Sequence, residues 1–349
     1  MPVLHREGLG YAPYLEGQLR ITIIEHINYE GEYFKEGVLY RFFRSGKGFF
    51  HRYTKTINYI KKEQPDFLFV QGLIFPFQVI LLRLKVGKKV KFIVQHHGGK
   101  PFGGIKKIFQ RIADRYIDAY VFTASGNSTE WIEKGVIKNE SKIKEILEGS
   151  TWFEKRDKQA CRKRLNISGN PLLLWVGRLH TNKDPITVLR GFKKYVEQDP
   201  SASLYMIFGE DGLVAEVKAY IFLNGLQDAV KLVGKIGHAD LPVWYSAADL
   251  FISGSLSEGS GYALLEAMAC GCVPVVTNIP SFKKITGEGH YGYLFEPGDE
   301  NGLLDTLIKV KLTDLEAFSE KIRDHFKQEL SFSSIARKLF KLCAQLTAE

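Results

Sequence analysis

Short apolar runs alternate with helix-length amphipathic segments from about residue 20 to residue 277, and this alternation constrains the fold most strongly. It is the pattern of repeated strand–helix units, whose strands pair in parallel. The predicted strands of the first half cover residues 21–26, 66–71, 91–95, 119–124 and 142–147. Those of the second half cover residues 172–176, 204–208, 230–233, 249–253 and 273–277. We therefore predict an α/β protein with two doubly wound, Rossmann-like domains.

The stretch of residues 154–170 interrupts this alternation near the middle of the chain. It is a charged, helix-like segment that ends in Ile-Ser-Gly-Asn-Pro, where Gly and Pro punctuate the chain before the next strand. A chain of 349 residues also exceeds the size of one ordinary hydrophobic core. We predict a first domain over residues 1–165, a second over 166–325, and a C-terminal helix over 326–349 that packs back toward the first domain.

Residues 1–18 form neither a clear strand nor the glycine-rich turn with which a doubly wound domain usually begins. The first strand–helix unit is therefore expected to be missing or degenerate. The same region lacks the apolar stretch of a signal peptide, so a cytoplasmic location is expected. Gln71, Gly72 and Pro76 interrupt the uncharged run at 67–82, which favours a strand, a turn and a helix over a membrane span.

The charge and the cysteines narrow the function without fixing it. A net charge of +9 suits phosphate-bearing ligands, nucleic acid or an anionic membrane surface, and charge alone does not choose among them. No pair of cysteines has the spacing of a zinc knuckle or a redox Cys-x-x-Cys motif. Reduced thiols in the core are expected at Cys161, Cys270, Cys272 and Cys343.

The most informative stretch covers residues 253–277, which follow a predicted strand and open a helix. Gly259 and Gly261 remove side chains where the loop turns into that helix. The backbone N–H groups of residues 260–264 could therefore approach a ligand phosphate at the positive helix end. Glu258 precedes the turn and Glu266 follows it, so both carboxylates could address one ligand. A lone glycine pair before a helix is, by itself, weak evidence for a phosphate site.

A second motif covers residues 174–185, with the sequence Leu-Trp-Val-Gly-Arg-Leu-His-Thr-Asn-Lys-Asp-Pro. It places Arg178 at the carboxyl end of a predicted strand and Lys183 at the start of the next helix. Ligands bind at such strand ends in parallel sheets, and one Arg with one Lys suits a diphosphate. The two motifs together predict a nucleotide-diphosphate site.

Four segments in this order strongly resemble the retaining glycosyltransferases of family 4, the glycosyl transferases group 1. They begin at Val176-Gly-Arg-Leu, Ile207-Phe-Gly-Glu-Asp-Gly, Val233-Gly-Lys-Ile-Gly-His and Glu258-Gly-Ser-Gly. The resemblance is dense over residues 172–299 and looser over 66–150. It implies the glycosyltransferase-B fold, in which two Rossmann-like domains face each other across a cleft, with the acceptor on the first and the nucleotide sugar on the second.

The resemblance implies a role for each matching position. Arg178 and Lys183 would bind the donor diphosphate and neutralise the charge on the leaving nucleotide. Glu258 would contact the donor sugar and Glu266 the ribose hydroxyls, while backbone groups near Gly234 would face the base. The implied donor-site residues are Arg178, Lys183, Gly209, Gly234, Ile236, Glu258, Gly259, Ser260, Gly261, Tyr262, Ala263, Leu264 and Glu266.

A histidine of the first half completes the implied catalytic set. Residues 92–99, Phe-Ile-Val-Gln-His-His-Gly-Gly, resemble the family's strand that ends in His-Gly. His97 fits this position best because Gly98 follows it. His96 stays an alternative, since adjacent strand side chains point to opposite faces. His238 is predicted to be a capping or surface residue rather than a ligand contact.

The implied reaction breaks the bond between the anomeric carbon and the diphosphate and delivers an acceptor hydroxyl to the same face of the sugar. Leaving-group stabilisation by Arg178, Lys183 and the helix end would dominate. No cofactor or essential divalent ion is expected, because no Asp-x-Asp follows a predicted strand. The donor is expected to be a nucleotide sugar, with UDP favoured over GDP, and the acceptor a glycan or a lipid-linked glycan.

The chain departs from the family pattern at three places. Ser260 stands where the family often has an aromatic residue. Residues 279–282, Ile-Pro-Ser-Phe, lack the usual paired glycines after the strand. The glycine loop of the first domain is not recognisable in residues 1–18.

The segment Lys100–Arg115 interleaves apolar and basic residues at helical spacing. It could lie on an anionic membrane, at the inner face of the cell membrane, or pack as an ordinary helix on the first domain, and both interpretations stay open. Nucleic acid is not expected as a partner because no recognition module accompanies the charge.

Three functions remain to be compared. The leading one is an active sugar transferase. The alternatives are a catalytically inactive nucleotide-sugar-binding partner of another transferase and a nucleotide-sugar epimerase on the same architecture. A dehydrogenase is disfavoured because no predicted strand is followed by Gly-x-Gly-x-x-Gly and a ribose-binding acid.

Overall fold

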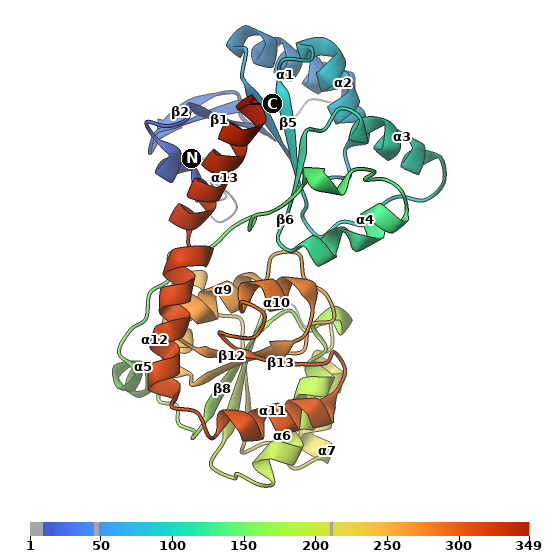
Figure 1. The fold of residues 1–349 in the computed structure, drawn as a ribbon. Helices are drawn as coiled ribbons and strands as arrows, with labels where there is room; N and C mark the ends of the chain where they lie inside the picture. The colour runs from blue at the N-terminus through green and yellow to red at the C-terminus, as the bar shows by residue number, and fades with distance from the viewer. Residues whose placement is uncertain (1–9, 45–48, 210–211, 349) are drawn as a thin grey trace. The chain divides into compact units, whose positions relative to one another are not determined.

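A computed structural model describes residues 10–44, 49–209 and 212–348 (Figure 1). The chain divides into two compact units. The first consists of Met1–Ser150 together with Phe332–Glu349, and the second of Thr151–Ser331. The boundary predicted after residue 165 lies at the end of a helix of the second unit, α5 (Lys158–Leu165).

The second unit is built on a parallel sheet with the strand order β10-β9-β8-β11-β12-β13. Counted along the chain this is the order 3-2-1-4-5-6, which defines a doubly wound dinucleotide-binding fold. The strands are apolar because helices cover both faces of such a sheet. They are β8 (Leu172–Gly177), β9 (Ser203–Phe208), β10 (Val230–Gly234), β11 (Leu250–Ser253), β12 (Val273–Thr277) and β13 (Tyr293–Phe295).

The helices of the second unit follow the strands in regular alternation. Side-chain carboxylates cap four of them: Asp157 caps α5, Asp184 accepts a hydrogen bond from the amide of Thr187, and Asp299 and Asp314 cap two later helices. Besides α5 the helices are α6 (Pro185–Val196), α7 (Val214–Leu223), α8 (Leu241–Ala247), α9 (Tyr262–Ala269), α10 (Pro280–Ile285), α11 (Glu300–Val310) and α12 (Leu315–His325). The short turns η4 (Thr181–Lys183) and η5 (His238–Asp240) and the π-helical η6 (Phe326–Leu330) complete the unit.

The described residues of the first unit form two separate sheets. The larger is parallel, in the order β4-β5-β6-β7, and comprises β4 (Phe67–Gln71), β5 (Lys91–Gln95), β6 (Ala119–Phe122) and β7 (Ile143–Glu145). The smaller has the order β1-β3-β2, where β1 (Ile21–Ile27) runs parallel to β3 (Val38–Arg44) and β2 (Gly31–Lys35) pairs antiparallel with β3.

Helices complete the core of the first unit. They are α1 (Phe49–Glu63), α2 (Pro76–Val86), α3 (Gly104–Asp114), α4 (Thr129–Glu133) and α13 (Phe332–Ala348), with the turns η1 (Ala12–Leu15), η2 (Ser125–Ser128) and η3 (Glu140–Lys142). The buried core includes Phe92, Phe122 and Trp131. The red helix α13 in Figure 1 ends the chain, yet it belongs to this unit and packs against η1.

A buried arginine ties the helices of the first unit to its larger sheet. Arg83 on α2 donates to the carbonyl of Val90 at 2.7 Å and to Oδ2 of Asp118 at 2.9 Å. Asp118 also accepts the amide of Phe92 at 2.7 Å, and the guanidinium lies 4.1 Å from the ring of Phe92. This buried charge is therefore paired and hydrogen-bonded, as burial requires.

The predicted α/β class and the doubly wound, Rossmann-like architecture are confirmed, and every predicted strand is present within a few residues. The predictions missed β2, β3 and β13. β1 leads into the β2–β3 hairpin rather than into a helix, so the expected irregularity of the first strand–helix unit lies after β1. Residues 67–82 form β4, a turn and most of α2, as predicted.

The described residues contain no helix that is both long and apolar enough to cross a membrane. The cysteines, all within the described chain, are free thiols. Burial raises the pKa of Cys270 to about 12 and that of the less deeply buried Cys343 to about 11. Both thiols are therefore protonated at neutral pH.

Candidate functional site

The candidate site of the second unit lies where its strand order reverses. β8 and β11 are neighbours in the sheet although β9 and β10 separate them in sequence. Their carboxyl ends, at Gly177 and Ser253, lead directly into the two motifs. Ligands of doubly wound sheets bind outside the carboxyl ends of the strands at such a reversal. Topology therefore puts both motifs at the expected binding edge.

Lys183 and Glu258 are in direct contact at this edge. The Nζ atom of Lys183 in η4 contacts Oε1 of Glu258 in the loop after β11. Their side chains are 21% and 14% exposed, so the pair is shielded but reachable. Ser255 Oγ donates to the same carboxylate oxygen at 2.7 Å. The arrangement offers one cation and one anion to a polar ligand.

Further hydrogen bonds join the two motif segments. The carbonyl of Asn182 accepts the amide of Leu256 at 2.8 Å. The Asn182 side chain donates to the carbonyl of Ser257 and accepts from Ser257 Oγ, both at 2.8 Å. Gly254 permits this approach, because a Cβ there would lie 2.8 Å from the carbonyl oxygen of Asp184.

Two hydroxyl groups donate hydrogen bonds to backbone carbonyls of the loop that carries Glu258. Thr277 Oγ1 at the end of β12 donates to the carbonyl of Ser255 at 2.6 Å. Ser281 Oγ on α10 donates to the carbonyl of Glu258. Ser281 lies in the segment that lacks the family's paired glycines, and its hydroxyl supports the loop there. These supporting residues were not predicted, because short polar side chains carry no sequence signal for their distant partners.

The start of α9 depends on Gly261. Its φ of 67° is unfavourable for residues with a side chain, and a Cβ there would lie 2.9 Å from Cδ1 of Ile285. Its carbonyl accepts the amides of Leu264 and Leu265 at 3.0 and 3.1 Å. α9 therefore begins beside residues 258–260, with the positive end of its dipole at the candidate site.

Glu266 is a buried carboxylate of α9 with both oxygens engaged. It is 7% exposed, Tyr245 OH donates to Oε2 at 2.9 Å, and His238 Nε2 lies 2.9 Å from Oε1. Burial, and then the charge of Glu266, raises the pKa of Tyr245 well above its usual value. Tyr245 is therefore a neutral hydrogen-bond donor. The contact between His238 and Glu266 was not predicted.

The remaining donor-site residues follow the ends of β8, β9 and β10. The Arg178 side chain is exposed directly after β8. A Cβ on Gly209, just after β9, would meet no atom within 4 Å, so protein packing does not demand glycine there. Gly234 ends β10 with a φ of 83°, and Ile236 is half-buried beyond it. Two residues of the quoted turn motif, Glu210 and Asp211, lie outside the described residues.

The two candidate histidines of the first unit have opposite environments. His96 is buried, stacks on Phe122 at 4.8 Å, and hydrogen-bonds the carbonyl of Gly99 at 2.8 Å. Burial lowers its pKa. His97 is exposed, and its Nδ1 contacts the buried carboxylate of Glu148. His97 is thus the member of the pair that solvent or a ligand can reach, and Glu148 is an unpredicted partner.

Comparison with solved structures identifies the architecture. The chain is similar to a sucrose-phosphate synthase from Thermosynechococcus elongatus, with a TM-score of 0.74, 18% identity, and coverage of 98% of this chain and 92% of that one. It is also similar to Anabaena HepE in complex with UDP and glucose, with a TM-score of 0.71, 16% identity, and coverage of 89% and 87%. The fold is that of the glycosyltransferase-B proteins.

The family follows from the sequence of the second unit. Residues 157–329 match the family described as glycosyl transferases group 1. Mannosylfructose-phosphate synthase of Agrobacterium fabrum is 32% identical over 159 residues, which cover 44% of this chain and 35% of that protein. The aligned part thus spans about a third of that relative's length. The predicted resemblance of the second-unit motifs to the glycosyl transferases group 1 family is thereby confirmed.

Proposed function

We propose that this protein is a retaining glycosyltransferase that moves a sugar from a nucleotide-sugar donor to a hydroxyl of a glycan or lipid-linked acceptor. The observation that carries the proposal is the contact between Lys183 and Glu258 where the strand order reverses. Family membership of the second unit supports it.

Each charged group has a role in the proposed reaction. Arg178, Lys183 and the start of α9 stabilise the negative charge that grows on the diphosphate as its bond to the anomeric carbon breaks. Glu258 contacts the donor sugar, and Glu266 accepts hydrogen bonds from the ribose hydroxyls. The acceptor oxygen then bonds the anomeric carbon on the face that the diphosphate has left, and the hydroxyl proton passes to the departing diphosphate.

The donor is proposed to be a UDP-sugar. Similarity in fold to HepE, whose structure contains UDP and glucose, supports UDP as the nucleotide to test first. Gly209 and Gly234 leave the ends of β9 and β10 without side chains, where the nucleotide would approach. We propose that protein groups, rather than a metal ion, neutralise the charge on the leaving diphosphate. Turnover is therefore expected to continue when EDTA removes divalent metal ions.

A surface of the first unit suits an acceptor held at an anionic membrane. On α3, Ile105 and Ile108 are 74% and 53% exposed, while Phe109 packs on Phe77 with ring centroids 4.3 Å apart. Exposed Lys106 follows Ile105 directly. Exposed apolar side chains flanked by lysine and arginine favour peripheral contact with anionic lipid. This surface supports the proposed location at the inner face of the cell membrane.

The test combines binding with turnover. UDP-, GDP- and ADP-sugars are screened by thermal shift, since a ligand at about 100 times its Kd adds about 2.7 kcal/mol of stability. Donor cleavage with and without candidate acceptors is then followed, with EDTA as a separate arm. Lys183→Ala and Glu258→Ala are expected to abolish cleavage. No shift with any donor would count against the proposal, and inversion at the anomeric carbon would reject the retaining mechanism.

A second candidate function is a catalytically inactive nucleotide-sugar-binding partner of another transferase. It is favoured by the β2–β3 hairpin, which follows β1 where a glycine-rich turn and a helix would begin a regular doubly wound domain. Thermal shift by a donor without cleavage or transfer, at any acceptor tested, would favour it over the transferase.

A further inference from the structure

We propose that His238 is a positioning residue for the nucleotide site: it orients the Glu266 carboxylate toward the ribose hydroxyls of the donor, and Phe153 fixes its ring. This inference rests on the proposed function, in which Glu266 binds the ribose. It assigns a role to His238, the last residue of one motif of the second unit, and to Phe153, which lies outside the motifs.

Glu266 needs a second partner to hold one orientation. It comes from the second turn of α9 and is almost wholly buried, so solvent cannot stabilise its charge. Tyr245 OH engages only Oε2, whereas His238 Nε2 holds Oε1 at 2.9 Å. An ionised carboxylate accepts about four hydrogen bonds. Tyr245 and His238 use two of these positions, and the others can accept the two ribose hydroxyls.

The position of His238 matches this role. It opens η5, a few residues after β10, and its side chain is 51% exposed. It therefore reaches a buried carboxylate from the solvent side, where a ligand would also arrive. Without His238, Oε1 of Glu266 would lose a donor, and the side chain could turn away from the ribose at little cost.

The ring of Phe153 packs against the imidazole of His238 and restricts the orientation of that imidazole. The two ring centroids are 4.8 Å apart, and the Phe153 ring lies 6.3 Å from that of Tyr245. Phe153 thus touches both side chains that hold Glu266. A tilted aromatic contact of this kind contributes about 0.5–1.5 kcal/mol, which is enough to select one orientation of an exposed ring.

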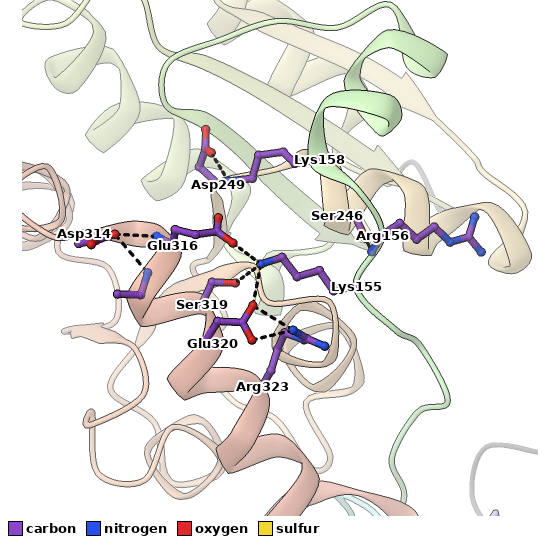
Figure 2. Close-up of polar contacts among 11 residues, drawn as sticks. Lys155, Arg156, Lys158, Ser246, Asp249, Asp314, Glu316, Ser319, Glu320 and Arg323 are labelled. Atoms are coloured by element: carbon purple, nitrogen blue, oxygen red, sulfur yellow. Dashed lines mark hydrogen bonds and ion pairs between the residues drawn. The ribbon is translucent and has the colours of Figure 1, made fainter.

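The segment that carries Phe153 is itself anchored to the second unit. Cys270 Sγ lies 3.7 Å from the carbonyl of Glu154, and the amide of Arg156 donates to Ser246 Oγ at 3.0 Å. Lys155 Nζ contacts Glu316 at 2.7 Å and Glu320 at 3.1 Å, both on α12, as Figure 2 shows. These contacts of residues 154–156, which directly follow Phe153, keep its ring against His238.

The test compares nucleotides with and without the ribose hydroxyls. UDP and 2′,3′-dideoxy-UDP are titrated by calorimetry into the wild-type protein and into His238→Ala, His238→Gln and Phe153→Ala, with GDP and its dideoxy analogue as a second pair. The matched control is His290→Ala, which removes another exposed histidine of the second unit, one that contacts the carbonyl of Gly287.

His238→Ala is expected to weaken UDP binding about 5–10-fold while changing the affinity for dideoxy-UDP less than about twofold. His238→Gln, which keeps a donor, is expected to recover most of the loss. Phe153→Ala should lower UDP affinity about threefold with the same selectivity, and His290→Ala should change neither affinity.

The possible results distinguish failure of the inference about His238 from failure of the proposed function. An equal loss for UDP and dideoxy-UDP would show that His238 only supports the fold locally, and no loss would show that Glu266 does not need it. Either result overturns the inference while leaving the donor site intact. If the wild-type protein binds none of the four nucleotides, the proposed function fails first and the inference falls with it.

Discussion

Lys183 Nζ contacts Oε1 of Glu258, although the two residues are 75 positions apart in the sequence. The contact joins the turn after β8 to the loop after β11, and a serine hydroxyl from that loop shares the carboxylate. Removing one member leaves the charge of the other in a shielded site, which is more costly than removing both.

Lys183→Met is therefore expected to lower the free energy of unfolding by about 1–3 kcal/mol and kcat/KM by at least about a hundredfold. The double variant Lys183→Met/Glu258→Gln should recover part of the stability but none of the activity. Urea unfolding and donor turnover check both effects. Lys193→Met removes a half-buried lysine of α6 that pairs with Glu197 four residues later, and it should change neither quantity. Recovery of activity in the double variant would contradict the proposed role of Lys183.

Gly209→Ala separates binding from folding. An added Cβ would meet no atom within 4 Å, and the backbone is not left-handed there, so the thermal midpoint should move by less than about 2 °C. Nucleotide affinity should fall about tenfold or more, because the methyl group would stand where the donor approaches. Gly103→Ala, at another open position with negative φ, is the matched control. Unchanged nucleotide affinity in Gly209→Ala would remove this residue from the site.

Gly261→Ala should damage the start of α9. Left-handed φ costs about 1 kcal/mol for alanine, and crowding against Ile285 adds to that cost. We expect a loss of about 2–4 kcal/mol in unfolding free energy together with loss of nucleotide binding. Gly298 also has a positive φ, but a Cβ there would meet no atom within 4 Å. Gly298→Ala should therefore lower the unfolding free energy only by the cost of the left-handed backbone. Equal losses in the two variants would show that packing at Ile285 is unimportant.

Lys155→Met tests the anchor on α12. Glu316 and Glu320 are largely exposed, so each ion pair contributes little, and the expected loss is about 1 kcal/mol in all. The effect should shrink in 0.5 M salt because screening weakens the pairs of the native protein. Lys218→Met, on the exposed side of α7, provides the comparison. A loss that does not depend on salt would indicate packing of the lysine stem instead.

His96 should make the first unit sensitive to mild acid. Burial lowers its pKa, so the unfolded chain takes up a proton at higher pH than the folded chain. Stability is therefore present above the unfolded pKa of about 6.5 and is lost as pH falls below it, by at most about 1.4 kcal/mol per pH unit. Hydrogen exchange of peptides from β5 and β6 between pH 7.5 and 5.5 measures this loss. In His96→Phe, which retains an aromatic ring beside Phe122, the pH dependence should be flatter; an identical slope would exclude His96 as its source.

The central strands could be predicted because a parallel sheet covered on both faces needs continuous apolar runs. Leu172–Gly177 and Val273–Thr277 are such runs. β2 could not be predicted in the same way, since Gly31–Lys35 mixes charged and aromatic residues on a largely exposed strand. β13 has only three residues, which is too short for a periodic signal.

Site residues could be predicted from the sequence where charged residues stand within a recognisable motif. Lys183 and Glu258 were expected at one site, and the structure brings them into contact. The bonds between Asn182 and Ser257 depend on two loops that meet only in the folded chain. The contact between Glu148 and His97 likewise forms only once the strands of the first unit have paired. Sequence spacing carries no information on such contacts until the fold is known.

The discontinuous first unit has a consequence for synthesis. Its strands are made first, but α13, whose residues Ile335, Leu339 and Leu342 are buried, is made only after the whole second unit. The second unit is one continuous stretch and can close its sheet while α13 is still inside the ribosome. The nascent first unit therefore has apolar surface uncovered around η1 until the whole second unit has been synthesised and α13 follows it.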